Sequence, residues 1–137
     1  MDTLSLFNQQ VTQCQDDAYT LAWYLLGSEA EAEAVTQCAV EAAFHCFSSP
    51  RDDCRLLILK HVVRHCRGQL PAANGTPGAH MLHELQALPF GQRLALVLVD
   101  VLGLGYLDAA CIADRPVKEV RWLLGQGRCI LGQKKVQ

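Results

Sequence analysis

Histidine and cysteine side chains lie close together at two places in the sequence, and such groups could ligate a metal ion. His61 and His65 are one helical turn apart with Cys66 adjacent, and His80 and His83 form a second pair. No Cys-x-x-Cys pair is present to complete a typical structural zinc site. Histidines and cysteines on a basic helix more often pack or face solvent, so we expect no metal ion and no cofactor.

Seven cysteines are the other reactive groups. The odd count, together with the lack of an export signal, predicts free thiols in a reducing cytoplasm. A redox-sensing thiol is the alternative, and Cys54 beside Arg55 or Cys129 beside Arg128 would suit it best. The sequence contains no nucleophile with a paired base and no phosphate-binding glycine loop, so we expect that the protein is not an enzyme.

Charge is distributed unevenly along the chain. Residues 1–50 contain seven acidic residues and no Lys or Arg, a net charge of −7. The remaining residues hold all 12 basic residues against seven acidic ones, a net charge of +5. The two ends are therefore expected to face different partners. The alternative is that both are solvated surfaces that merely balance.

The composition is that of a packed globular protein, with 50% hydrophobic and 19% charged residues. The longest apolar run, Leu94 to Val99, is too short to span a bilayer. We therefore expect a cytoplasmic protein without a membrane partner.

The first half of the sequence predicts three helices. Apolar residues recur at steps of three and four between Phe7 and Leu25, and Gly27 ends that helix. Ser28 and Glu31 form a capping box for a second helix that runs to about Cys46. Ser49 as cap and Pro50 as first helical residue start a third helix, which is apolar on one side and basic elsewhere.

The second half begins with a turn-rich segment, 71–79, which we interpret as a linker between module 1–70 and module 80–137. A short helix around Met81 to Ala87 precedes a segment opened by Pro89, in which 94–102 fits a helix or a buried strand; we favour a helix. Two short helices follow, the second starting at Pro116, in a helix-turn-helix pattern. The predicted fold class is all-α.

A spaced set of residues runs without a gap from Leu88 to Leu131: Leu88, Pro89, Gln92, Arg93, Val97, Gly103, Leu104, Tyr106, Asp108, Ala110, Ile112, Pro116, Val117, Val120, Arg121, Leu124, Arg128 and Leu131. This set resembles region 4 of the bacterial extracytoplasmic-function (ECF) sigma factors, which reads the upstream promoter element. More weakly, Leu21, Ala22, Leu25, Gly27, Ala32, Glu33, Gln37 and Phe44 are similar to region 2 of that family, which docks on RNA polymerase and opens the downstream element.

The resemblance implies promoter DNA and RNA polymerase core as partners, with an anti-sigma factor as a further one. The last helix would place Arg115, Lys118 and Arg121 in the major groove, with Arg128, Lys134 and Lys135 on phosphates. The residues implied for polymerase binding are Glu33, Gln37 and Glu41, and those for downstream-element DNA are Arg55, Lys60, Arg64 and Arg67.

Departures from the family pattern favour an alternative function. Positions 122–127 lack the usual cations, Gly125 and Gly127 weaken the last helix, and the nine-residue linker reaches at most about 30 Å. Such a chain could be a sigma-like interaction module that binds an anti-sigma factor or itself, without initiating transcription.

Overall fold

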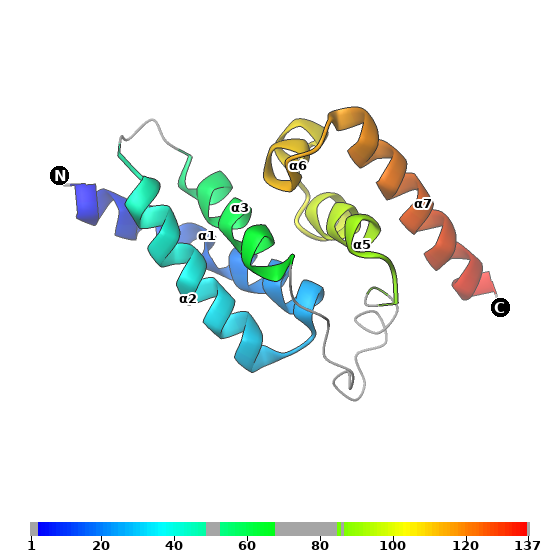
Figure 1. Ribbon diagram of the computed structural model, residues 1–137, viewed down its shortest axis with the longest axis horizontal. Helices are drawn as coiled ribbons and strands as arrows, with labels where there is room; N and C mark the ends of the chain where they lie inside the picture. The colour runs from blue at the N-terminus through cyan, green and yellow to red at the C-terminus, as the bar shows by residue number, and fades with distance from the viewer. Residues whose placement is uncertain (1–2, 49–52, 68–84, 86, 137) are drawn as a thin grey trace.

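The computed structural model describes residues 3–48, 53–67, 85 and 87–136, and the regular elements in these ranges are helices (Figure 1). In chain order they are α1 (Thr3–Leu26), α2 (Glu29–Cys46), α3 (Cys54–Cys66), α5 (Phe90–Leu96), a π-helical turn (Val97–Val101), α6 (Tyr106–Ala113) and α7 (Val117–Val136). The predicted all-α class is confirmed, and segment 94–102 is helical rather than a strand. No helix in the described part of the chain is long and apolar enough to cross a membrane.

The first helix boundaries follow local signals in the sequence. Gly27 has a φ of 78°, which residues with a Cβ rarely adopt, and it ends α1. The Ser28 hydroxyl then accepts a hydrogen bond from the Glu31 N–H at 3.4 Å, as the capping box predicted. The third helix is capped by Asp53, whose Oδ1 accepts from the Leu56 N–H at 3.1 Å. The start predicted at Ser49 and Pro50 lies outside the described residues.

Helices α1, α2 and α3 pack around a shared apolar core (Figure 1). Each helix contributes its apolar stripe, and the largest fully buried side chains are Phe7, Leu21, Leu25, Leu26, Ile58, Leu59, Val62 and Val63. Burying one such side chain stabilises the fold by about 1.5–3 kcal/mol. The Phe7 ring also lies 5.2 Å from the rings of both Phe44 and Phe47. The core residues thus fix how α1 and α2 lie side by side.

The second helical group contains α5, the π-helical turn, α6 and α7. The Leu102 N–H donates to the Val97 carbonyl five residues back at 2.9 Å, and Gly103, with a φ of 72°, ends the turn. After α6, Asp114 adopts a left-handed conformation with a φ of 56°. The last helix begins at Val117, one residue after the predicted Pro116.

Gly127 has a packing role that the sequence did not reveal. It is buried on α7, and a Cβ there would lie 2.7 Å from Leu96 Cδ1 of α5. A Cβ at Gly125 would meet nothing within 4 Å. Both glycines were predicted to weaken the helix, and Gly127 in addition permits the close approach of α5 and α7.

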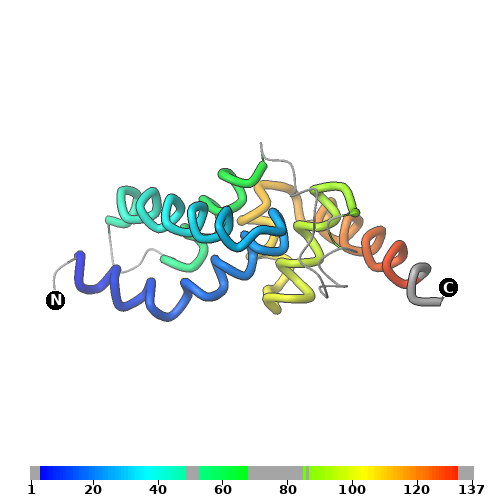
Figure 2. Tube along the Cα trace, turned by 90° about the horizontal axis from the view of Figure 1, so that it is seen from below, coloured from blue at the N-terminus to red at the C-terminus, as the bar shows by residue number. Residues whose placement is uncertain are grey.

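The two helical groups touch through α3 and α6, and a few residues of α1 reach α5 (Figure 2). Helix α7 lies on the side of the second group that faces away from α1–α3 (Figure 1). The predicted linker 71–79 lies outside the described residues, as does the short helix around 81–87 except for Leu85 and Ala87. Among the described residues, contact between the groups leaves the outer face of α7 uncovered.

Candidate nucleic-acid and polymerase interfaces

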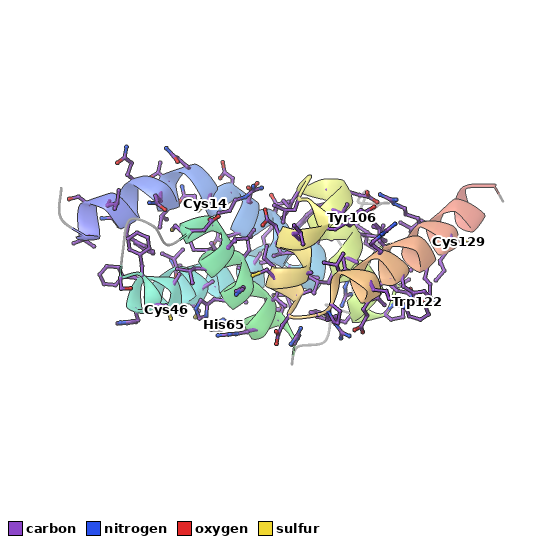
Figure 3. The ribbon with its side chains drawn as sticks, turned by 90° about the horizontal axis from the view of Figure 1, so that it is seen from above. Cys14, Cys46, His65, Tyr106, Trp122 and Cys129 are labelled. Atoms are coloured by element: carbon purple, nitrogen blue, oxygen red, sulfur yellow. The ribbon has the colours of Figure 1, made fainter. Side chains whose placement is uncertain are left out.

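The outer face of α7 is exposed along most of its length. Lys118, Arg121, Gly125 and Cys129 face solvent, and Trp122 is 60% exposed. On the opposite face, the side chains of Val120 and Leu124 are buried against α5 and α6. Figure 3 shows Trp122 and Cys129 at the surface of this helix. The face that the sequence predicted to meet DNA is thus open.

The cations at the start of α7 differ in how firmly they are held. Arg115 pairs with Glu119 one turn later at 2.5 Å. The Arg121 guanidinium lies 5.5 Å from the centre of the Tyr106 ring and stays exposed. Lys118 is exposed and makes no ion pair with any described residue. Lys118 and Arg121 are therefore the two side chains that could extend from this face toward a ligand.

The predicted phosphate contacts further along α7 are less available. Arg128 forms a two-point ion pair with Asp100 of the π-helical turn, with Nε–Oδ2 at 3.0 Å and Nη2–Oδ1 at 2.5 Å. The side chains of Lys134 and Lys135 lie outside the described residues. The carboxylate that holds Arg128 was not foreseen, because Asp100 lies 28 residues away in the sequence.

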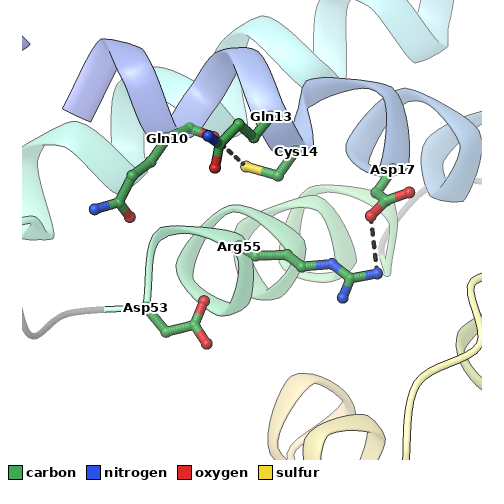
Figure 4. Close-up of a pocket in the computed structure, with 6 residues that line it drawn as sticks. All are labelled: Gln10, Gln13, Cys14, Asp17, Asp53 and Arg55. Atoms are coloured by element: carbon green, nitrogen blue, oxygen red, sulfur yellow. Dashed lines mark hydrogen bonds and ion pairs between the residues drawn. The ribbon is translucent and has the colours of Figure 1, made fainter. Parts of the chain in front are cut away.

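The four cations predicted for downstream-element DNA lie in two places on α3 and at its C-cap, Arg67. Arg55 pairs with Asp17 of α1 at 2.8 Å, beside an open hollow of about 610 Å³ lined by Gln10, Gln13, Cys14, Asp17, Asp53 and Arg55 (Figure 4). Lys60, Arg64 and Arg67 instead line a second hollow, between α3 and α6. Arg67 donates from Nη2 to the Ala113 carbonyl at 2.5 Å. Three of these cations thus face the second helical group.

The residues predicted to bind polymerase lie along the boundary between α1 and α2. Glu33 and Gln37 line a hollow of about 280 Å³, together with Gln15, Asp16, Tyr19 and Thr36. Glu41 lines a neighbouring hollow of about 250 Å³ whose other lining residues are mostly apolar: Leu4, Phe7, Asn8, Val40, Phe44 and His45. Since both lie between the same two helices, they form one surface, which we call the α1/α2 groove.

The contribution of α1 to the α1/α2 groove was missed from the sequence. Asp16 and Tyr19 are one turn apart and line the acidic hollow, and Leu4, which is 53% exposed, lines the apolar one. The acidic excess of residues 1–50 pointed to this half of the chain. An exposed leucine within a helical stripe was the remaining signal.

The structure corrects the prediction for one of the two candidate redox thiols. Cys54 is 1% exposed, and burial, followed by the neighbouring Cys14 thiol, raises its pKa to about 12. It is therefore protonated at neutral pH and unreactive, despite its position beside Arg55. Cys129 is exposed on α7, but the adjacent Arg128 is committed to Asp100.

The histidines that suggested a metal site have other contacts. His61 Nε2 lies 3.8 Å from the Cys46 sulfur, and His65 Nδ1 lies 2.7 Å from the His61 carbonyl oxygen. Cys66 is fully buried, and burial raises its pKa to about 12. His80 and His83 lie outside the described residues. Within the described part of the chain, no three His, Cys, Asp or Glu side chains are grouped to hold a metal ion.

Two packed helical groups, the second ending in two helices joined by a tight turn, make up the fold. A chain in the co-crystal structure of the sigma factor RpoE with the anti-sigma factor NepR from Bartonella quintana matches with a TM-score of 0.79 and 14% identity, over 93% of this chain and 94% of that one. A chain in the structure of CnrH in complex with the cytosolic domain of CnrY matches with a TM-score of 0.79 and 22% identity, over 93% and 85%.

A third match is to a chain in the co-crystal structure of the anti-anti-sigma factor PhyR with NepR from the same organism, with a TM-score of 0.72 and 19% identity, over 93% of this chain and 49% of that one. No protein-family model and no curated protein matches the sequence. The predicted resemblance to ECF sigma factors is confirmed at the level of the fold.

Proposed function

We propose that the protein is a sigma-factor-like transcription regulator, in which α7 binds promoter DNA and the α1/α2 groove binds RNA polymerase core. The observation that carries this proposal is the open face at the start of α7, where Lys118 and Arg121 are exposed on the side of the helix opposite the buried Val120 and Leu124. Binding of this kind requires no catalytic group.

The first turns of α7 have the chemistry that duplex DNA requires. Lysine and arginine donate to base edges and phosphates, and the amino end of a helix carries partial positive charge. Arg115, Lys118 and Arg121 lie within two turns of that end. Glu119 neutralises part of this charge through Arg115, so Lys118 and Arg121 would supply most of the affinity.

The α1/α2 groove has the chemistry of a protein-docking surface. Its acidic hollow, with Asp16 and Glu33, suits cationic side chains, and its apolar hollow, with Phe7 and Phe44, suits a buried anchor. A partner surface with basic residues beside an apolar side chain would fit both. In the proposed function, that partner is RNA polymerase core.

The second candidate is a sigma-like interaction module that binds an anti-sigma factor or another copy of itself. The observations that favour it are the Arg128–Asp100 ion pair, which occupies a predicted phosphate contact, and the exposed Trp122. One of the structures matched above contains a sigma factor in complex with an anti-sigma factor. This function also would not need the cations absent from positions 122–127.

The DNA role is tested by the salt dependence of binding to promoter-like duplexes, measured by fluorescence anisotropy. We expect binding at low salt, and we expect Arg121→Ala to weaken it and to reduce the salt slope by about one. Cys129→Ser, a neutral change on the exposed face of the same helix, should leave binding unchanged. Absence of binding at low salt would remove the DNA role.

The polymerase role is tested by recovering polymerase core on the immobilised protein. The Glu33→Lys and Glu41→Lys double variant should lose stoichiometric recovery, because it reverses charge along the groove. Glu31→Lys reverses one charge on α2 away from both hollows and should retain recovery. If the unaltered protein recovers an anti-sigma factor but no polymerase, the second candidate replaces the first.

A further inference from the structure

A small hollow between α3 and α6 brings an exposed thiol next to three basic side chains. Lys60 and Arg64 line it from α3, and Arg67 lines it from the residue after α3. Cys111 lines it from α6, and Asp114 lines it from the turn after α6. Its volume is about 80 Å³. Neither the metal hypothesis nor the redox hypothesis from sequence included Cys111, because the three cations lie more than 40 residues from it.

The hollow carries a local positive charge. Three cations face one carboxylate, and the hydrogen bond from Arg67 to the Ala113 carbonyl fixes one cation beside α6. Their field is felt over about one Debye length, which is about 10 Å at 0.1 M salt. A small anion would therefore be attracted to the space in front of the Cys111 thiol.

We propose that Cys111 is a thiol-modification site that reacts with anionic disulfides, of which glutathione disulfide is the common cellular example. The Cys111 thiol loses its proton to solvent, and its sulfur attacks one sulfur of the disulfide. A new S–S bond joins Cys111 to one half of the reagent, and the other half leaves as a thiolate that takes up a proton. The carboxylates of the reagent are held by Lys60 and Arg64.

The other cysteines lack this setting. Cys38 is exposed on α2, a helix that contains glutamates but no Lys or Arg. Cys46 is exposed and contacts His61, and Cys129 lies beside an arginine that is paired with Asp100. The remaining three, Cys14, Cys54 and Cys66, are buried. Cys111 is the exposed thiol that shares a hollow with three cations.

Modification would have a consequence for the function proposed above. A glutathionyl group on Cys111 would place carboxylates among Lys60, Arg64 and Arg67, for which the resemblance to ECF sigma factors implies contact with downstream-element DNA. It would also compete with the Ala113 carbonyl for Arg67. This consequence depends on the proposed function, whereas the chemical test below uses no DNA and no polymerase.

The test uses a full-length variant in which Cys38, Cys46 and Cys129 are replaced by serine, so that Cys111 is the remaining exposed thiol. Its rate constants are measured with an anionic disulfide, dithiobis(nitrobenzoate), and with a neutral one, dithiodipyridine. Dividing the first by the second cancels differences in thiol exposure and acidity. We expect this ratio to fall as salt is raised, and to fall at least about threefold at low salt in Lys60→Gln/Arg64→Gln.

Lys118→Gln/Arg121→Gln provides the matched control, since it removes the same charge from α7 outside the hollow. Circular dichroism checks that each variant is folded. If a charge variant does not fold, the salt dependence of the rate ratio in the serine variant still tests the proposal. The proposal is overturned if the ratio is insensitive to Lys60 and Arg64, or if both pairs lower it equally. It is also overturned if glutathione disulfide modifies Cys38, Cys46 or Cys129 of the unaltered protein in preference to Cys111, as mapped by peptide mass.

Discussion

Arg67, one residue beyond the end of α3, donates a hydrogen bond from Nη2 to the main-chain carbonyl of Ala113 at the end of α6, 46 residues later in the chain. The last carbonyls of a helix lack partners within it and carry partial negative charge, so a guanidinium there is favourable. This bond ties the first helical group to the turn that precedes α7.

Arg67→Ala should therefore loosen the contact between α3 and α6. We expect the free energy of unfolding to fall by about 1 kcal/mol, because the bond is charge-assisted but its donor is exposed. We also expect a larger radius of gyration in small-angle X-ray scattering. Arg64→Ala, a change at an exposed arginine in the last turn of α3, should leave both unchanged; equal effects from both variants would refute a specific role for Arg67.

Gly127 and Gly125 offer a paired test of the packing between α5 and α7. Gly127→Ala should destabilise the fold by about 1–2 kcal/mol, because the new methyl would press on the buried Leu96 side chain. Gly125→Ala should stabilise it by about 0.5–1 kcal/mol, because that position is open and alanine favours the helix. Chemical denaturation measures both, and stabilisation by Gly127→Ala would contradict the close approach.

Release of Arg128 from Asp100 should increase DNA affinity if the proposed function holds. The pair is about half exposed, so Asp100→Asn should change stability by about 1 kcal/mol or less. We expect two- to fivefold tighter binding at low salt, roughly the effect of one added phosphate contact. Arg128→Ala should then cost more affinity in the Asp100→Asn background than in the unaltered protein.

Asp108→Asn is the control for the Asp100→Asn variant. Asp108 is exposed on α6, so its replacement removes the same negative charge without releasing Arg128. If Asp108→Asn and Asp100→Asn raise DNA affinity equally, the gain reflects net charge alone.

The sequence predicted those parts of the fold that depend on neighbouring residues. The cap at Ser28, the helix end at Gly27 and the apolar stripes of α1 and α3 are set within one or two turns, and the structure has them where expected. The π-helical turn at 97–101 was not predicted, because its apolar residues suit any buried helix equally well. The role of Gly127 was missed since it depends on Leu96 of another helix.

The sequence predicted which residue types form the candidate site, but not the ion pairs that these residues make. Arg115, Arg128 and Arg55 were expected to be available to DNA, yet each is held by a carboxylate. Of these partners, only Glu119 lies within one turn of its arginine, where sequence spacing could have revealed it. Asp17 and Asp100 lie next to their arginines only because separate helical segments pack together in the fold. The same holds for the α1 side chains that line the α1/α2 groove.

His61 gives a pH dependence whose sign follows from its surroundings. Partial burial, followed by the charges of Arg64, His65 and Lys60, lowers its pKa below the ordinary value of 6.5. The unfolded chain therefore takes up this proton before the folded one does, and the stability that depends on neutral His61 is lost as pH falls below about 6.5. Urea unfolding at pH 7.5 and pH 5.5 should show a smaller loss for His61→Gln than for the unaltered protein. His45→Gln, an exposed histidine of α2, should keep the full loss, and equal losses in all three proteins would show that His61 is not the titrating group.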